Sequence, residues 1–266
     1  MEYHYLANNI ASTMHKVTIN VVGCGGTGSH VLSSLAAMNH ALVSMGRQPL
    51  HVKAFDPDVV TEHNVGRQAF STADIGENKA NVLISRINRF YGAAWTAVPT
   101  RFGIEKPRPE FHRDFFYGAN FTISCVDTVE SRKEIQHVLH EMAMEDTKVP
   151  DYAFPYYWMD IGNSDKFGQV ILGTVKHVPQ LAREQQRIEF CQLPDFFAEF
   201  PYAKDNPVEP SCSMAESLMH QDLFINKIMA TYAIQMLWEL LMQFRINYRG
   251  LYVNLNDGKT SKIFLD

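Results

Sequence analysis

The stretch that decides the fold reads VTINVVGCGGTG and runs from Val17 to Gly28. Its first half is an apolar run rich in β-branched residues, which is typical of a buried parallel strand. Its second half is a turn whose glycines allow backbone N–H groups to approach a phosphate at a helix start. These glycines are Gly23, Gly25, Gly26 and Gly28. Apolar residues recur at helical spacing directly after them, so the order is strand, turn and helix.

The alternation of strand and helix continues along the first half of the chain. It predicts strands at 51–55, 95–101 and 121–126, and helices at 75–91 and 135–142. Strands that alternate with helices favour a mostly parallel sheet with helical crossovers. We therefore predict an α/β fold, a Rossmann-like doubly wound sheet, whose nucleotide-binding half covers residues 17–145.

The second half of the chain has a different pattern. Short apolar segments predict strands at 150–154, 156–161 and 169–175, the last two as an antiparallel hairpin. A long, poorly periodic crossover loop follows at 176–212. The sequence SMAE at 213–216 fits a capping box for a helix that runs, with one break, to residue 244. Segments 251–255 and 263–265 predict a terminal hairpin, and we expect residues 1–266 to form a single domain.

Composition and charge exclude several classes of function. The net charge is −5 with both signs mixed, so no basic stripe for direct nucleic-acid binding is present. The apolar stretch 228–244 is interrupted by Gln235, Glu239 and Gln243, which argues against a membrane span. The first residues lack a basic segment followed by an apolar run, so we expect no secretory signal and a cytoplasmic location.

The four cysteines form no C-x-x-C pair, and no zinc site is expected. Cys24 and Cys125 are interpreted as turn or core residues. Cys212 directly precedes the expected capped helix, where a thiol pKa is lowered, and it is equally consistent with a buried helix-start residue. Cys191 is a weaker candidate for a reactive thiol.

Charged and polar residues follow the expected strand ends. Asp56 follows the second strand, where an acid can accept both ribose hydroxyls, although an Asp before Pro57 also forms turns. Arg67 and Lys79 supply positive charge that a hydride-transfer cofactor does not require. The alternative interpretations are a solvated helix face for Arg67 and Gln68, an exposed helix residue for Lys79, and a helix cap for Asp127.

Several of these elements together resemble the superfamily of E1-like, ThiF and MoeB adenylating enzymes. They are the acids Asp56 and Asp58, the run NVGRQ at 64–68, the run GENK at 76–79 and the run SCVD at 124–127. The resemblance covers residues 17–145, about half of the chain. The stretches CSMAE at 212–216 and QDLFIN at 221–226 add a similarity to ThiF-related proteins of bacterial PRTRC plasmid cassettes.

The resemblance implies an activity. It implies that Mg²⁺ and ATP are used to adenylate the C-terminal carboxylate of a small ubiquitin-like β-grasp or sulfur-carrier protein. The implied catalytic residues are Arg67 and Asp127, with Cys212 as the acceptor in a thioester step. The implied nucleotide-binding residues are Gly23, Gly25, Gly26, Gly28, Asp56, Asp58, Asn64, Arg67, Gln68, Lys79 and Asp127. Within this set, Asp56 binds the ribose, Asn64, Arg67 and Lys79 bind phosphates, and Asp127 binds Mg²⁺.

Other interpretations stay open at this point. One is an NAD-dependent oxidoreductase, and another is an ATP-binding scaffold for plasmid maintenance that has lost turnover. A third is an enzyme that adenylates a small molecule or a tRNA base. A homodimer is also open, because dimeric relatives lend an arginine from an N-terminal helix and no arginine precedes Arg47 in this sequence.

Overall fold

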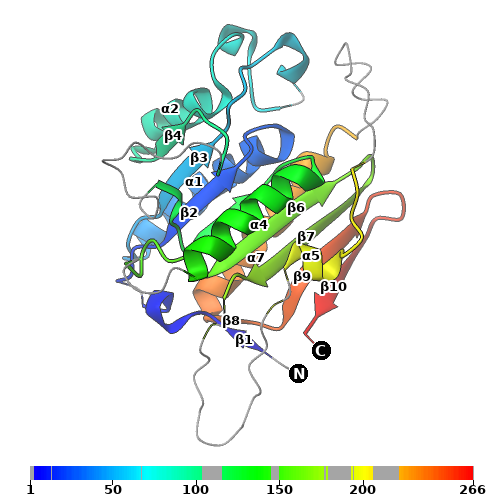
Figure 1. Cartoon of the computed structure of the whole chain (residues 1–266). Helices are drawn as coiled ribbons and strands as arrows, with labels where there is room; N and C mark the ends of the chain where they lie inside the picture. The colour runs from blue at the N-terminus through cyan, green and yellow to red at the C-terminus, as the bar shows by residue number, and fades with distance from the viewer. Residues whose placement is uncertain are drawn as a thin grey trace, which may run out of the picture.

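The computed structural model describes residues 3–12, 14–66, 68–103, 116–144, 150–176, 178, 193, 195–205 and 222–265. Its main element is an eight-stranded sheet (Figure 1). The strands are β2 (Thr18–Val22), β3 (His51–Phe55), β4 (Thr96–Val98), β5 (Phe121–Ser124), β6 (Tyr157–Asn163), β7 (Phe167–Thr174), β9 (Tyr248–Asn254) and β10 (Lys259–Phe264). Their order across the sheet is β10-β9-β7-β6-β5-β2-β3-β4.

The sheet is parallel on one side and antiparallel on the other. Strands β4, β3, β2, β5 and β6 pair in parallel, whereas β6, β7, β9 and β10 pair antiparallel in turn. All five residues of β2 are buried, as expected for a central strand covered on both faces. Two strands outside this sheet, β1 (His4–Tyr5) and β8 (Arg245–Ile246), pair with each other and bring distant parts of the chain together.

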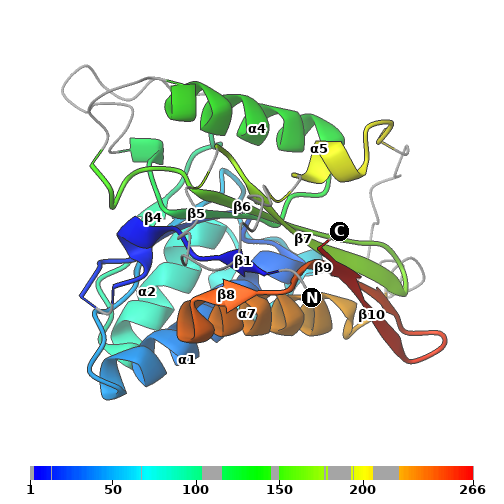
Figure 2. The ribbon, with the colours of Figure 1, turned by 90° about the horizontal axis from the view of Figure 1, so that it is seen from below.

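Helices cover both faces of the sheet. They are α1 (Gly26–Ser44), α2 (Lys79–Tyr91), α4 (Val129–Met144), α5 (Phe196–Glu199) and α7 (Ile225–Gln243), with short 3-10 turns at Asn8–Ile10, Glu62–Asn64 and Thr72–Asp74. Figure 2 shows α4 and α5 on one face and α1, α2 and α7 on the other. The larger core lies on the α1, α2 and α7 side, with Leu35 and Leu237 fully buried. A smaller core, with Trp158 and Leu139, lies under α4 and α5.

Helices α1 and α7 lie side by side and run in the same direction. At their first turns, Thr27 Oγ1 donates to Asn226 Oδ1 at 2.9 Å. Near their ends, the Arg47 guanidinium donates to the Leu241 carbonyl at 2.9 Å and stacks on the ring of Phe244. Both helices therefore begin at the same edge of the sheet, the edge where the parallel strands end.

The fold class predicted from the sequence is confirmed, a doubly wound and mostly parallel sheet with antiparallel additions. The predicted strand at 150–154 is wrong, because residues 151–153 form a turn in which Ala153 N donates to Pro150 O at 2.8 Å. The described part of the last long helix begins at Ile225. The predicted start at 213–216 and most of the crossover loop at 176–212 lie outside the described residues.

Candidate functional site

The glycine turn lies at the carboxyl ends of β2, β3 and β5. Gly23 N donates to Phe55 O at 2.9 Å, and Cys125 N donates to Val22 O at 2.8 Å, so the turn sits between the ends of β3 and β5. Gly23 has a φ of +91°, and a Cβ there would lie 2.7 Å from the carbonyl oxygen of Cys125. Only glycine fits this position without strain.

Helix α1 begins at Gly26. Its N-cap residue in the described structure is Gly25, which has no side chain that could cap the helix. A Cβ at Gly28 would lie 1.8 Å from the carbonyl oxygen of Gly23, so the turn and the helix pack backbone against backbone. The first N–H groups of a helix without a cap are suited to bind an anion such as a phosphate.

Asp56 follows β3 and is buried against the glycine turn. Its Oδ2 accepts a hydrogen bond from Cys24 N at 2.6 Å, and its Oδ1 accepts one from Asp58 N at 2.8 Å. Burial raises the pKa of Asp56, while the two N–H groups and the charge of Lys79 oppose that rise. Each carboxylate oxygen still has a second lone pair for a hydroxyl donor. The predicted ribose contact is compatible with this arrangement and stays a prediction.

Lys79 is the first residue of α2. The preceding residue, Asn78, connects this helix to the segment that follows β3. Its Nζ lies 2.9 Å from Asp58 Oδ2, and the Lys79 side chain is buried while that of Asp58 is exposed. Asn78 Nδ2 donates to the carbonyl oxygens of Asp56 and Asp58 at 2.8 and 3.0 Å. The alternative interpretation of Lys79 as an exposed helix residue is therefore wrong, because only 8% of the residue is exposed.

The loop between β3 and α2 contacts the first turn of α1, since Ala69 N donates to Ser29 Oγ at 3.3 Å. In this loop, Asn64 Oδ1 accepts hydrogen bonds from the N–H and hydroxyl of Thr61. The Asn64 amide nitrogen makes no hydrogen bond to a described residue, so it remains available as a donor. Gln68 is buried, and its Oε1 has no partner within the described ranges. A donor on a ligand would remove the cost of leaving this acceptor unpaired.

Asp127 is an exposed residue between β5 and α4. The start of α4 is capped by other groups, since Ser131 N donates to Thr128 Oγ1 at 3.1 Å and Val129 N donates to Asp205 Oδ1 at 2.5 Å. Asp127 itself makes no hydrogen bond or ion pair with the described part of the chain. The alternative interpretation of Asp127 as a helix cap thus has no contact to support it.

Asp127 has the chemistry of one Mg²⁺ ligand, but it does not belong to a group of metal-binding side chains in the described structure. A carboxylate is a ligand that Mg²⁺ prefers, and Mg²⁺ in nucleotide sites is bound through one or two carboxylates together with phosphates and waters. The described residues contain no group of three or more His, Cys, Asp or Glu that could hold a metal ion. Asp127 would therefore bind Mg²⁺ together with a nucleotide and not in a protein cage.

Two asparagines at this edge do not stand out in the sequence. Asn163 ends β6 and Asn226 lies in the first turn of α7. Thr27 Oγ1 lies within hydrogen-bond distance of both, and Asn163 Nδ2 donates to Asn226 Oδ1 at 3.2 Å. A Cβ at Gly26 would lie 2.7 Å from Asn226 Nδ2. The sequence signal is weak, because Asn163 belongs to a pattern typical of a turn and Asn226 lies far along the chain.

The cysteines divide into described and undescribed positions. Cys24 is buried in the glycine turn and Cys125 is partly buried after β5, as expected for turn and core residues. Burial raises the pKa of both thiols, with the nearby carboxylate of Asp56 or Asp160 adding to the rise. Both thiols are therefore protonated at neutral pH. Cys191 and Cys212 lie outside the described residues, and so does Arg67.

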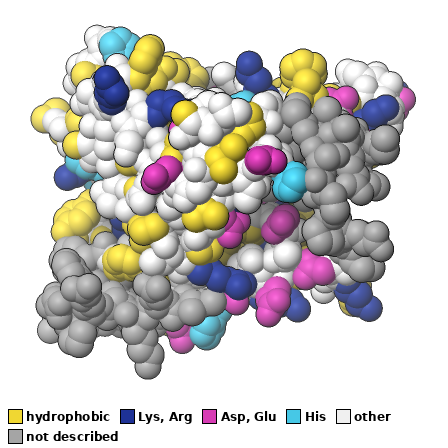
Figure 3. Space-filling model, turned by 90° about the horizontal axis from the view of Figure 1, so that it is seen from above, with side chains coloured by type: hydrophobic (Ala, Val, Ile, Leu, Met, Phe, Trp, Pro, Cys, Tyr) yellow, Lys and Arg dark blue, Asp and Glu magenta, His cyan; other side chains and the backbone are white. Residues whose placement is uncertain are grey.

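The surface at this side of the molecule carries charges of both signs. On the face drawn in Figure 3, Lys and Arg side chains are scattered among acidic and uncharged ones.

Among the described helices, none is long and apolar enough to cross a membrane.

The fold and these residues together define the class of the protein. It is a Rossmann-like α/β protein with a glycine turn, an uncapped helix start and strand-end acids at one edge of the sheet. The chain belongs to the ThiF family, whose model matches residues 7–261. No curated protein is similar enough in sequence to count as a relative.

Solved structures similar to this chain agree with the fold. A crystal structure of PaaA matches with a TM-score of 0.56 and 14% identity, and E. coli MccB together with MccA-N7isoASN matches with 0.54 and 13%. A structure of E. coli MccB with ATP matches with 0.52 and 13%. Each match covers 96% of this chain and 66% of the other, so the chain spans a little less than two thirds of those proteins.

Proposed function

We propose that this protein is an ATP-dependent adenylating enzyme that activates the C-terminal carboxylate of a small ubiquitin-like β-grasp protein. The observation that carries the proposal is that three groups suited to bind parts of a nucleotide lie at the edge of the sheet where the parallel strands end. The uncapped start of α1 is suited to bind phosphate, the Gln68 Oε1 needs a donor, and Asp127 lacks a partner in the described structure. ThiF family membership and the structure of MccB with ATP support the choice of nucleotide.

In the proposed reaction, a carboxylate oxygen of the partner attacks the α-phosphorus of ATP. A new oxygen–phosphorus bond forms, the bond to the bridging oxygen between the α- and β-phosphates breaks, and pyrophosphate leaves. Mg²⁺, when bound, would neutralise charge on the phosphates. The residues of this chain bind and orient the reactants, and they need not react covalently in this step.

The roles that the resemblance implies are supported by contacts and free groups of these residues. Asp56 can accept a ribose hydroxyl with lone pairs that its backbone contacts leave free. The Asn64 amide nitrogen can donate to a phosphate oxygen, because Thr61 already holds its oxygen. The Lys79 ammonium would bind a phosphate by turning away from Asp58, whose carboxylate is exposed to solvent.

The role of Arg67 and the identity of the acceptor rest on the family resemblance. The resemblance assigns Arg67 to the phosphates and Cys212 to a later step, in which its sulfur attacks the acyl carbonyl and AMP leaves. The crystal structure of MccB together with MccA-N7isoASN supports a peptide or small protein as the partner. The resemblance also suggests a homodimer, which light scattering on the purified protein would test.

The experiment is ATP–pyrophosphate exchange with Mg²⁺ and a β-grasp partner, comparing wild type with Asp127→Asn. We expect the exchange rate to fall by about 10² to 10³ in this variant, as for loss of one charge-stabilising group. Glu130→Gln is the matched control, since Glu130 is an exposed acid on the first turn of α4 and should leave the rate unchanged.

Two further results would separate the remaining interpretations. Cys212→Ala should retain exchange and lose only a thioester that forms afterwards. Measurable ATP binding without exchange by the wild type, with any β-grasp partner tried, would favour the scaffold. Binding of NAD in place of ATP would favour the oxidoreductase.

A further inference from the structure

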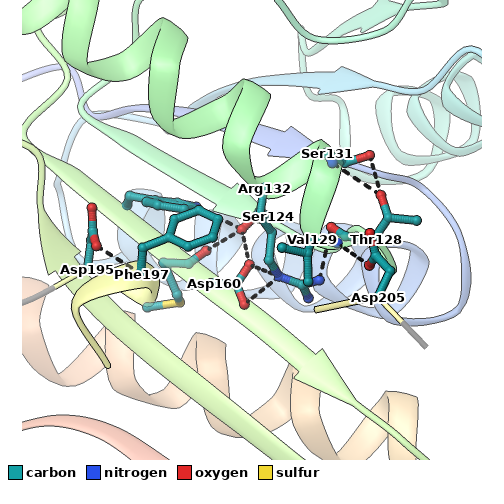
Figure 4. Close-up of polar contacts among 11 residues, drawn as sticks. Ser124, Thr128, Val129, Ser131, Arg132, Asp160, Asp195, Phe197 and Asp205 are labelled. Atoms are coloured by element: carbon teal, nitrogen blue, oxygen red, sulfur yellow. Dashed lines mark hydrogen bonds and ion pairs between the residues drawn. The ribbon is translucent and has the colours of Figure 1, made fainter. Parts of the chain in front are cut away.

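A buried ion pair joins α4 to β6 beside the proposed metal ligand. Arg132 Nε donates to Oδ1 and Oδ2 of Asp160 at 2.9 and 3.1 Å (Figure 4). Only 5% of Arg132 and 1% of Asp160 is exposed. Burial raises the pKa of the Asp160 carboxyl, and the Arg132 guanidinium and the Ser124 hydroxyl oppose that rise.

The ion pair is bonded to both ends of the segment that carries Asp127. On the preceding side, Ser124 ends β5, and its hydroxyl donates to Asp160 Oδ1 at 2.6 Å. On the following side, Arg132 Nη1 donates to the carbonyl oxygen of Thr128 at 3.2 Å. Residues 125–127 lie between these two contacts. The residues on either side of them, Ser124 and Thr128, are therefore both hydrogen-bonded to the same ion pair.

Neighbouring groups restrict this network further. Trp158 Nε1 donates to Ser124 Oγ at 2.8 Å, which directs the serine hydroxyl hydrogen toward Asp160. The ring of Phe196 packs on the Arg132 guanidinium, with 5.0 Å between the ring centre and Cζ. Every member of the network thus has a defined partner, and Asp127 lies between the two held ends with its carboxylate unpaired among the described residues.

Stability alone is a weak reason for such a pair. Desolvation of two charges offsets most of their attraction, and a packed apolar pair of similar volume is often as stable. What an apolar pair cannot provide is a directed hydrogen bond to Ser124 on one side and to the Thr128 carbonyl on the other. These two hydrogen bonds hold the backbone on both sides of Asp127, and an exposed carboxylate keeps a fixed position only if its backbone is held.

We propose that Arg132 and Asp160 are positioning residues for the nucleotide site, which fix segment 125–128 so that the Asp127 carboxylate is held where metal and phosphate bind. The proposal rests on the proposed function for what Asp127 binds. It adds two residues that would not touch the nucleotide, and it assigns them an effect on metal dependence.

Arg132→Lys tests the proposal because lysine keeps the charge beside Asp160 but cannot also reach the Thr128 carbonyl. We expect the Mg²⁺ concentration for half-maximal ATP binding to rise about tenfold. This is the lower end of the loss in metal affinity that follows when a group that orients a metal ligand is removed. ATP binding measured without Mg²⁺ should stay as in the wild type. Arg101→Lys is the matched control. Arg101 forms an exposed ion pair with Glu134, which lies on α4 like Arg132.

Hydrogen exchange of the peptide 121–131 provides a readout without nucleotide. We expect faster exchange of this peptide in Arg132→Lys than in wild type or Arg101→Lys. Ser124→Ala keeps the ion pair and its bond to the Thr128 carbonyl, and it removes the bond from Ser124 to Asp160 together with the acceptor of Trp158 Nε1. It should therefore produce a smaller change of the same kind. This second variant decides the question if Arg132→Lys does not fold.

Two outcomes would overturn the inference. One is a lower melting temperature in Arg132→Lys with unchanged Mg²⁺ dependence, which would indicate a structural role only. The other is unchanged exchange of peptide 121–131 in both variants. If wild type binds no ATP, the proposed function fails instead, and the exchange of this peptide alone then supports or overturns the positioning role.

Discussion

Gly28 is the residue at which the backbone of the turn and the helix approach most closely. Replacing it with alanine would put a Cβ 1.8 Å from the carbonyl oxygen of Gly23, and a backbone atom cannot rotate away. We expect Gly28→Ala to lower the free energy of unfolding by about 1–3 kcal/mol or more, as for overpacked sites. Urea unfolding measures this loss, and ATP binding should weaken with it because the turn must move.

Gly25→Ala is the control in the same turn. No atom lies within 4 Å of a Cβ built at Gly25, so an alanine side chain there meets no neighbouring atom. Its loss of stability should be clearly smaller than that of Gly28→Ala. Equal losses would mean that the turn is sensitive to any side chain, and the close approach at Gly28 would not be the cause.

At the scale of elements, Asn78 joins the start of α2 to the end of β3. Its Oδ1 caps α2 by accepting from Asn81 N at 3.1 Å, while its Nδ2 donates to two carbonyl oxygens of the segment that contains Asp56. Asn78→Ala should lower the free energy of unfolding by about 1–2 kcal/mol through loss of the cap. It should also weaken ATP binding.

Asn78→Ser separates the two roles, because serine caps a helix but cannot reach both carbonyls. We expect Ser to recover about 1 kcal/mol relative to Ala without recovering the ATP affinity. Calorimetric titration of ATP into both variants measures the affinity. Recovery of affinity by Ser would argue that only the cap matters.

The elements also show what could be predicted from the sequence. The strand at Thr18–Val22 and its glycine turn are predictable because a β-branched run and glycines are local signals. The segment at 150–154 misleads because its apolar and aromatic residues mimic a strand. Its backbone is held in a turn by contacts that include the distant Asn120, whose Nδ2 donates to Asp151 O.

Parts of the candidate site depend on the assembled sheet and could not be predicted. Arg132 and Asp160 meet only because β6 pairs with β5 in the register that sets Ser124 opposite Asp160. Asn226 reaches Thr27 only because α7 packs parallel to α1. By contrast, the strand-end acids Asp56 and Asp127 are identifiable, since their position depends only on where each strand ends.

At the scale of the whole molecule, the parallel and antiparallel parts of the sheet share one core. Residues of α1 and α7 are buried in the same cluster, so we expect one cooperative unfolding transition. Trp95 lies at the β4 side of the sheet and Trp238 on α7. In Trp95→Phe and in Trp238→Phe, tryptophan fluorescence and circular dichroism should give the same urea midpoint. Different midpoints within one variant would indicate two separate folding units.

The pairing of β1 with β8 has a practical consequence for experiments on this protein. Leu6 N donates to Phe244 O at 2.9 Å next to that pair, and β10 runs antiparallel to β9 so that it ends on the same side. The two ends of the described chain therefore emerge near each other (Figure 1), away from the glycine turn. An affinity tag, a fluorophore or a sensor-chip tether attached at either end would leave the opposite side open to the proposed nucleotide and the proposed partner protein.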